Sequence, residues 1–268
     1  MKDYTAKDIR NIGVFGHGGE GKTTLTEAML FNAGLIDRLG KVENGTTTTD
    51  YDPEEIARGI SINVALAPLE WKNTKINVID APGFFDFYGE VTAAMALADS
   101  ALIVISAVSG PVVGAEKAMA MCEKSHKARM IAINQLDREN ANFEKVMGEI
   151  NAKFGPSVVP IQLPIIEGGA FKGYVDVVHM TGKLFDGKGE KEVAIPAAME
   201  KTAQSYYEKL TEAAAEADEE LMEKYLETFE LSREAMLKGL SAGLQPGGAN
   251  PVTSVAPRRI ASIVNPVS

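Results

Sequence analysis

The stretch at 10–24 constrains this chain more than any other, because it has the pattern of a buried strand, a glycine-rich loop and an amphipathic helix in succession. The loop at 16–23 is GHGGEGKT, which fits the phosphate-binding pattern G-x-x-x-x-G-K-[ST]; its two flanks favour that role over a plain glycine-rich turn. Glycines there let successive backbone N–H groups turn toward phosphate oxygens at the positive end of the helix. Lys22 is expected to contact the β- and γ-phosphates, and the Thr23 hydroxyl to bind Mg²⁺. The predicted nucleotide-binding residues of this loop are Gly16, His17, Gly18, Gly19, Glu20, Gly21, Lys22, Thr23 and Thr24.

The overall composition is that of an ordinary globular protein. Its 268 residues, 45% of them hydrophobic and 24% charged, suffice for one large domain or one domain with an insertion. The longest apolar run, 101–108, is too short to cross a bilayer, and the polar start is no signal peptide, so we expect a cytoplasmic protein without membrane contact. The formal net charge of −10 argues against broad binding to nucleic acid, so no direct DNA binding is expected. The single Cys122 excludes an internal disulfide and a cysteine metal cluster.

Apolar strands and helices alternate in the first part of the chain. Strands are expected at 61–71, 75–80, 101–108 and 129–134, and helices from Lys22 to near Gly34 and at 91–99, 114–127 and 140–154. This alternation predicts an α/β fold with a mainly parallel sheet flanked by helices. The segments 158–165, 173–180 and 183–193 are predicted to form a small antiparallel group, followed by helices at 196–216, 218–228 and 232–243. We therefore expect a first domain at 1–155, a small inserted α/β subdomain at 156–245, and a return to the first domain at 246–268 with a strand at 250–253.

An acidic residue ends the predicted strand at 75–80. A carboxylate at the tip of a strand beside the P-loop strand is where a Mg²⁺-associated acid belongs, which makes Asp80 the candidate; the alternative is a residue that merely caps a turn. Gly83 would bring a backbone N–H against the γ-phosphate, an approach that a Cβ would hinder. The predicted nucleotide-binding residues here are Asp80, Ala81, Pro82, Gly83 and Phe84.

A long polar stretch at 37–59 precedes Ser61. So long a loop in a compact domain is usually functional or disordered. The Ser61 hydroxyl could complete the coordination of Mg²⁺ when a γ-phosphate is present, which would order the loop and release it after hydrolysis. This makes 37–61 a candidate switch segment; the alternative is a serine that simply begins a strand.

The stretch after the strand at 129–134 bears on which base is bound, because a P-loop alone does not separate ATPases, kinases and GTPases. Asn134, Gln135, Leu136 and Asp137 resemble the NKxD guanine-reading motif of GTPases. The carboxylate of Asp137 can accept from guanine N1–H and N2–H₂ together, whereas adenine offers no such pair. Asn134 would brace the loops or reach the base edge. Gln135 replaces the usual lysine and is shorter and uncharged, so we expect a preference for GTP over ATP with weakened affinity.

With these motifs, the chain resembles the GTPase domain of translation elongation factor G. The matching stretches are NIGVFGHGGEGKTTLTEAMLFNAG, RGISI, DAPGFFDF and NQLDRENANFEKV, then GPSVVPIQLPI, FKGYVDVVHM and AAEADEELMEKYLE of the subdomain that this family inserts. The resemblance covers about 7–245 and implies a P-loop GTPase fold, GTP and GDP as ligands with Mg²⁺, and hydrolysis that drives a ribosome-associated switch. The sequence at 37–62 is most similar to an elongation factor G paralogue group, and the tetracycline-resistance ribosomal protection proteins are the alternative. Family members continue into further domains, through which ribosome contact is expected.

Within that resemblance, Lys22, Ser61 and the Gly83 amide are the expected catalytic groups, and Thr23, Ser61 and Asp80 the expected metal ligands. The family has a water-positioning histidine where this chain has Phe84, and phenylalanine has no hydrogen-bonding atom. This predicts slow hydrolysis, or a GTP-binding module with little hydrolysis; the alternative is that Phe84 only packs while the backbone or a partner positions water. Ser254, Val255 and Ala256 stand where the family's closing base loop lies, but the sequence after 256 matches poorly.

Overall fold

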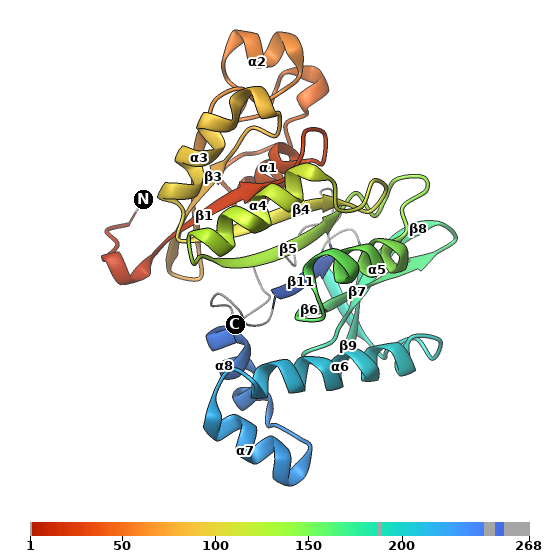
Figure 1. Ribbon diagram of the computed structural model, residues 1–268. Coiled ribbons are helices and arrows are strands. Elements are labelled where there is room, and N and C mark those ends of the chain that lie inside the picture. The colour runs from red at the N-terminus through yellow and green to blue at the C-terminus, as the bar shows by residue number, and fades with distance from the viewer. Residues whose placement is uncertain (1, 187–188, 244–249, 255–268) are drawn as a thin grey trace.

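The computed structural model describes residues 2–186, 189–243 and 250–254. Within these residues the strands form a seven-stranded sheet of order β2-β3-β1-β4-β5-β11-β6 and a four-stranded sheet of order β10-β9-β8-β7 (Figure 1). β2 is antiparallel to β3, and the other described pairs of the large sheet are parallel. The fold is therefore the α/β fold with a mainly parallel sheet that the sequence predicts, and a small antiparallel sheet lies beside it.

The strands of the large sheet are β1 (Ile9–Phe15), β2 (Ala65–Trp71), β3 (Thr74–Asp80), β4 (Ser100–Ser106), β5 (Ala128–Asn134), β6 (Val158–Pro160) and β11 (Asn250–Ser254). Alternate residues of the buried central strand β4 face opposite sides, as a strand requires. Leu102 and Val104 join the hydrophobic cluster under α1 (Lys22–Asn32), while Ile103 and Ile105 join the cluster on the other face. That other face is covered by α3 (Tyr88–Leu97), α4 (Val113–Lys124) and α5 (Phe143–Phe154).

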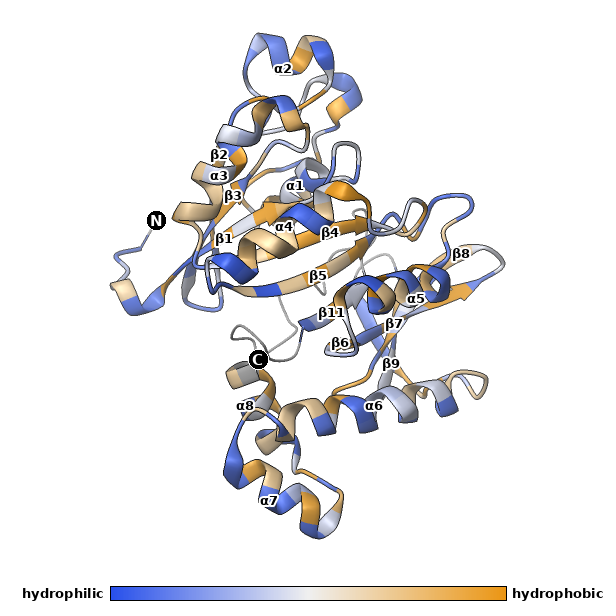
Figure 2. Cartoon of the chain, in the orientation of Figure 1, coloured by the Kyte–Doolittle hydropathy of each residue, from blue (hydrophilic) through white to orange (hydrophobic). Residues whose placement is uncertain are grey.

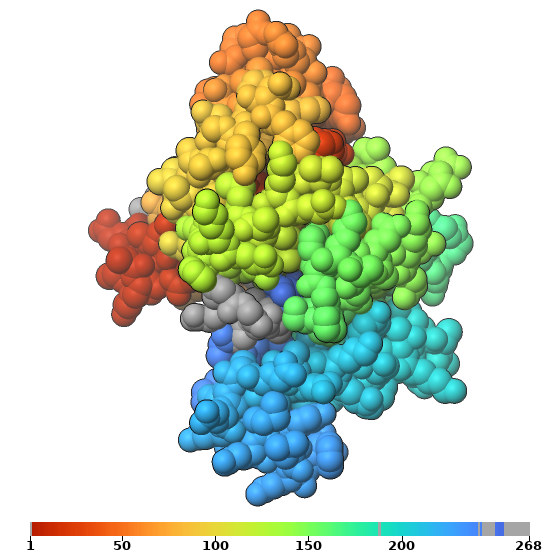
Figure 3. Space-filling view, in the orientation of Figure 1, coloured from red at the N-terminus to blue at the C-terminus, as the bar shows by residue number. Residues whose placement is uncertain are grey.

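The second sheet lies beside the first (Figure 1). Its strands are β7 (Gln162–Glu167), β8 (Ala170–Asp176), β9 (Thr181–Phe185) and β10 (Glu190–Val193), followed by α6 (Glu200–Ala215), α7 (Glu219–Thr228) and α8 (Arg233–Gly243). Hydrophobic residues run along the central strands β4 and β5, whereas hydrophilic residues dominate α2 (Pro53–Arg58) and α7 (Figure 2). These two helices lie at opposite ends of the molecule (Figure 3). No helix in the described residues is long and apolar enough to span a membrane.

The segment 158–165, expected as one strand, is two. The Ile161 N–H donates to the Val252 carbonyl in the large sheet, and the Ile161 carbonyl accepts from Val177 in the inserted part. This residue therefore turns the chain from β6, which pairs with β11, into β7 of the second sheet. The boundaries at 155 and 245 remain a prediction, although β6 lies inside the range given to the insertion and pairs in the large sheet.

The polar stretch at 37–59 is more regular than its composition suggests. It contains a 3₁₀ turn at Val42–Asn44 and the short helix α2, and short 3₁₀ turns also occur at Ala6–Asp8 and Phe85–Phe87. Asp52 caps α2 by accepting from the Glu54 N–H, Pro53 occupies the first helical position, and Glu55 accepts from the Asp52 N–H. The predicted strand at 61–71 starts only at Ala65, because the N–H groups of Ile62 and Asn63 donate to Glu55 of α2 and not to a neighbouring strand.

Candidate functional site

The P-loop lies at the carboxyl end of the parallel strands, where β1 gives way to α1. Gly19 and Gly21 have φ of +82° and +86°, a left-handed conformation that favours glycine. A Cβ on Gly21 would lie 2.6 Å from the Asn134 side-chain nitrogen, so the loop also packs tightly against the end of β5. These local requirements explain the glycines of the motif.

Lys22 is the first residue of α1, directly after this loop, and is only 6% exposed. Its Nζ donates to the His17 carbonyl at 2.8 Å. A Cβ on Gly83 would lie 2.4 Å from Lys22 Nζ and 2.6 Å from the Gly18 nitrogen, so the backbone at Gly83 closes directly onto the lysine and the loop. Burial lowers the pKa of Lys22, and the nearby carboxylates, above all that of Asp80, oppose this shift. The structure therefore brings together the lysine and the glycine that the sequence assigns to the phosphates.

The three predicted metal ligands also meet. β1 and β3 are neighbours in register, which puts Asp80 opposite Val14 at the start of the P-loop. The Thr23 and Ser61 hydroxyl oxygens are 3.1 Å apart. One oxygen of Asp80 accepts from the Thr49 hydroxyl at 2.8 Å, and the other is buried without a hydrogen-bond partner in the described residues.

The environment of Asp80 fits a cation-associated acid. Burial raises the pKa of Asp80 to about 6, while the Thr49 hydrogen bond and the charge of Lys22 hold it lower than burial alone would. The described residues contain no cluster of three His, Cys, Asp or Glu side chains able to hold a metal by themselves. A carboxylate beside two hydroxyls suits Mg²⁺, which keeps waters and takes substrate phosphates as ligands.

Asp50 and Thr49 are residues of this site that the sequence reasoning missed. Ser61 donates to Asp50 at 2.7 Å, and Asp50 is 4% exposed although it lies in a polar stretch. Thr49 contacts Asp80 as described above. The run of four threonines followed by an aspartate, just before a capped helix, was the available signal. Threonine hydroxyls beside Asp50, in the same loop as Ser61, indicate that this loop folds against the predicted metal ligands.

The loop after β5 braces the P-loop from the other side. Asn134 is fully buried, and its Nδ2 donates to the Glu20 carbonyl at 2.8 Å. Gln135 Nε2 donates to the Gly19 carbonyl at 3.0 Å, and Gln135 Oε1 accepts from Ser106 at 2.7 Å. Gln135, which the sequence analysis considered only as a shorter, uncharged replacement of lysine, thus makes hydrogen bonds through both atoms of its amide group.

Leu136 and Asp137 differ sharply in burial. Leu136 is buried in the core, and Asp137 is exposed at the turn that follows it. A cavity of about 580 Å³ lies between the P-loop and this turn; Gln135, Arg138 and Asn140 contribute to its wall, together with Ser106 and Ser109. Gln135 of the predicted base-reading loop therefore lines a cavity that continues from the P-loop, whereas Asn134, Leu136 and Asp137 are not among the residues that line it.

Ser254, the first residue predicted for the closing base loop, is the last residue of β11 and lies beside β5. It is buried at the end of β11, its hydroxyl donates to the Gln162 carbonyl at 2.9 Å, and its N–H approaches Gln162 Oε1 at 3.4 Å. The Ser254 side chain thus links β11 to β7. Val255 and Ala256 lie outside the described residues.

Phe84 packs over the P-loop. It is 38% exposed, and a Cβ on Gly18 would lie 2.7 Å from its ring. The rings of Phe84 and Phe85 lie 6.4 and 5.7 Å from that of His17, measured between centroids. The ring covers the loop without offering a hydrogen-bonding atom to a water molecule.

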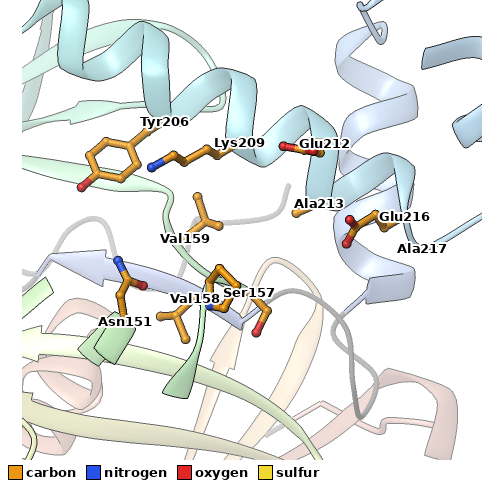
Figure 4. Close-up of a pocket in the computed structure, with 11 residues that line it drawn as sticks. Asn151, Ser157, Val158, Val159, Tyr206, Lys209, Glu212, Ala213, Glu216 and Ala217 are labelled. Atoms are coloured by element: carbon orange, nitrogen blue, oxygen red, sulfur yellow. The ribbon is translucent and has the colours of Figure 1, made fainter. Parts of the chain in front are cut away.

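A second cavity, of about 650 Å³, lies between α6 and the segment that leads into β6 (Figure 4). Tyr206, Lys209 and Glu212 of α6 face Val158 and Val159 across it. It is lined by none of the predicted site residues among those described, so it is separate from the P-loop site.

Glu20 should make the stability of the folded chain depend on pH. It is buried in the P-loop, accepts from the Ser109 hydroxyl at 3.3 Å, and has its pKa raised from 4.5 to about 7 by burial, against the opposing charge of Lys22. The Glu20 carboxyl releases its proton near pH 4.5 in the unfolded chain and only near pH 7 in the folded chain. The stability from this group is therefore full below about pH 4.5 and declines as the pH rises through about 7.

Glu20→Gln should remove that decline, because the amide stays neutral. At about pH 8 we expect the variant to exceed the parent in free energy of unfolding by roughly 3 kcal/mol, since the pKa rises from 4.5 to about 7 and each pKa unit corresponds to about 1.4 kcal/mol. Below about pH 4.5 the two proteins should be equally stable. Urea unfolding of both proteins across this range measures the difference; a gap that does not change with pH would contradict the buried-acid assignment.

Two comparisons with known proteins bear on this site. A sequence model of the family described as elongation factor Tu GTP binding domain matches residues 7–237. A crystal structure of a protein from Thermus thermophilus superposes with a TM-score of 0.88 at 37% sequence identity over 94% of this chain. The chain corresponds to 38% of the length of that protein. The family match spans the P-loop, the loop after β5 and most of the inserted segment.

Proposed function

This chain belongs to the family of elongation factor Tu GTP-binding domains, and from that premise we propose that it is the GTP-hydrolysing switch of an elongation factor G-like protein. The observation that carries the proposal is the meeting of Lys22 and Gly83 over the P-loop. Beside them, Thr23 and Ser61 are in contact and Asp80 has a buried oxygen without a hydrogen-bond partner in the described residues. Groups from three separate stretches converge there, as phosphoryl transfer requires.

In the proposed reaction the oxygen of a water molecule bonds to the γ-phosphorus of GTP, the bond between that phosphorus and the β–γ bridging oxygen breaks, and the products are GDP and inorganic phosphate. Lys22 and the Gly83 N–H stabilise charge on the phosphate oxygens, and the backbone N–H groups of the P-loop hold the phosphates. Thr23, Ser61 and Asp80 would hold Mg²⁺, which when bound supplies positive charge to the β- and γ-phosphates. Asp50 orients Ser61 through their 2.7 Å hydrogen bond.

The base is proposed to be guanine, read by Asp137, which lies in the turn whose neighbouring residues Gln135 and Arg138 line the cavity beside the P-loop. Asn134 and Gln135 fix the loop that carries Asp137 by their bonds to the Glu20 and Gly19 carbonyls. Because both bonds reach the P-loop, base and phosphates are held by one connected unit. Ser254, Val255 and Ala256 are proposed to close the base site from β11.

The proposed partner is the ribosome, because the family to which this chain belongs is described as the GTP binding domain of an elongation factor. The stretch 37–61 is proposed as the segment that responds to the γ-phosphate, since its Ser61 contacts Thr23 and its Asp50 accepts a hydrogen bond from Ser61. The alternative function with the ribosome as partner is that of a ribosomal protection protein. A GTP-binding module with little hydrolysis is the second candidate, and Phe84 favours it.

Single-turnover hydrolysis of GTP by the chain and by Phe84→His tests this function. The histidine can hydrogen-bond a water molecule where phenylalanine cannot, so we expect the rate to rise at least about tenfold. Phe85→His, which changes the neighbouring ring on the same His17, is the matched control and should leave the rate within about twofold. No hydrolysis by any of the three proteins, with ribosomes present or absent, would favour the GTP-binding module instead.

A further inference from the structure

A buried carboxylate on α1 bonds to the backbone of the polar stretch that leads to Thr49 and Asp50. Glu27 is 1% exposed and lies one helical turn after Thr23. Its Oε2 accepts from the Gly40 N–H at 3.1 Å, and its Oε1 accepts from the Thr48 N–H. Each carboxylate oxygen thus binds a different point of one loop.

The loop is shaped for this contact. A Cβ on Gly40 would lie 2.6 Å from Glu27 Oε2 and 2.4 Å from the Thr46 carbonyl, so only glycine lets the backbone come this close. The two bonded N–H groups bracket the 3₁₀ turn Val42–Asn44. The contact therefore fixes both ends of 40–48 rather than a single point.

The fixed segment runs straight into the site. Thr49, which bonds to Asp80, directly follows Thr48, and Asp50, which accepts from Ser61, comes next. Glu55 accepts from the N–H groups of Ile62 and Asn63, but that contact lies within the same segment. Glu27 instead ties the segment to α1, the helix that carries Thr23 and Lys22.

We propose that Glu27 is a positioning residue that holds 40–50 closed over the phosphate site and thereby favours the triphosphate over the diphosphate. The proposal rests on the proposed function, since it takes GTP as the ligand. A nucleotide whose γ-phosphate contacts the closed segment binds in proportion to the population of that state. The affinity for a nucleotide without the γ-phosphate depends less on whether 40–50 is closed.

Glu27→Gln tests the proposal in two readouts. The amide is neutral and turns an NH₂ group toward one of the two backbone donors, so at least one hydrogen bond is lost. In nucleotide-free protein, we expect deuterium exchange in 38–50 to become at least about tenfold faster. The affinity for GTP should fall about tenfold and that for GDP by less than about twofold.

Two companion variants keep the test decisive. Gly40→Ala places a methyl group against the same carboxylate from the loop side, and should reproduce both effects even if Glu27→Gln fails to fold. Glu43→Gln neutralises an exposed acid within the same loop and should change neither readout. Unchanged exchange in 38–50 for both Glu27→Gln and Gly40→Ala would overturn the proposal. Failure of the parent protein to bind guanine nucleotide would overturn the proposed function, while exchange would still decide whether Glu27 holds the loop.

Discussion

Lys22→Ala is expected to weaken the binding of GTP by at least about 100-fold, because hydrogen bonds to charged groups contribute roughly 1.5–3 kcal/mol each and the ammonium can serve two phosphates. Lys22 is already placed for this, buried between the His17 carbonyl and the Gly83 backbone. Isothermal titration with GTP and GDP in the presence of Mg²⁺ measures the loss.

Lys124→Ala is the matched control, because it removes an exposed lysine at the end of α4. It should bind GTP within about twofold of the parent. A Lys22→Ala protein that unfolds cooperatively and still binds GTP within about threefold of the parent would contradict the phosphate-binding role of this loop.

Asp80→Asn is expected to slow single-turnover hydrolysis about 100-fold, a loss typical of removing one group that stabilises transition-state charge. The amide removes the negative charge that faces Thr23 and Lys22, and it retains an oxygen that can accept from Thr49. We therefore expect the variant to need a higher concentration of Mg²⁺ than the parent to reach half of its maximal rate. Rates measured over a Mg²⁺ titration, in the Phe84→His background if the parent is slow, test both expectations.

Thr49→Val separates two roles of Asp80. If Asp80 acts only by anchoring the loop through Thr49, Thr49→Val should slow hydrolysis, whereas Asp80→Asn, which keeps an oxygen that accepts from Thr49, should not. If the charge of Asp80 acts on the metal and phosphates, Asp80→Asn should slow hydrolysis, and Thr49→Val should retain most of the rate and show the parent's dependence on Mg²⁺. An Asp80→Asn protein with the parent's rate and Mg²⁺ dependence would contradict the role of the charge.

Local patterns predicted the core of the fold because each is decided by a few adjacent residues. The apolar runs at β4 and β5 alternate between two hydrophobic clusters, and the strand, loop and helix around Lys22 follow one another as the motif predicts. The family was likewise identifiable at the level of the GTP-binding domain. The capping of α2 was present in the sequence as Asp-Pro-Glu-Glu, and its surrounding polarity concealed it.

Contacts between distant residues were not predictable in the same way. The turn from one sheet to the other at Ile161 depends on β11, which lies about 90 residues later in the chain. The bonds of Glu27 to Gly40 and Thr48, and of Ser61 to Asp50, join side chains and backbone that no periodicity relates. The two bonds of Gln135 also arise only once β4, β5 and the P-loop are side by side.

The affinity of the unmodified chain for GTP, GDP and ATP in the presence of Mg²⁺, measured beside Asp137→Ala, tests the central claim most directly. A carboxylate that accepts from two guanine donors should give GTP at least about a 100-fold advantage over ATP, and Asp137→Ala should remove most of it. Equal or stronger binding of ATP by the unmodified chain would contradict base reading by Asp137 and, with it, the assignment of this protein as a guanine-nucleotide switch.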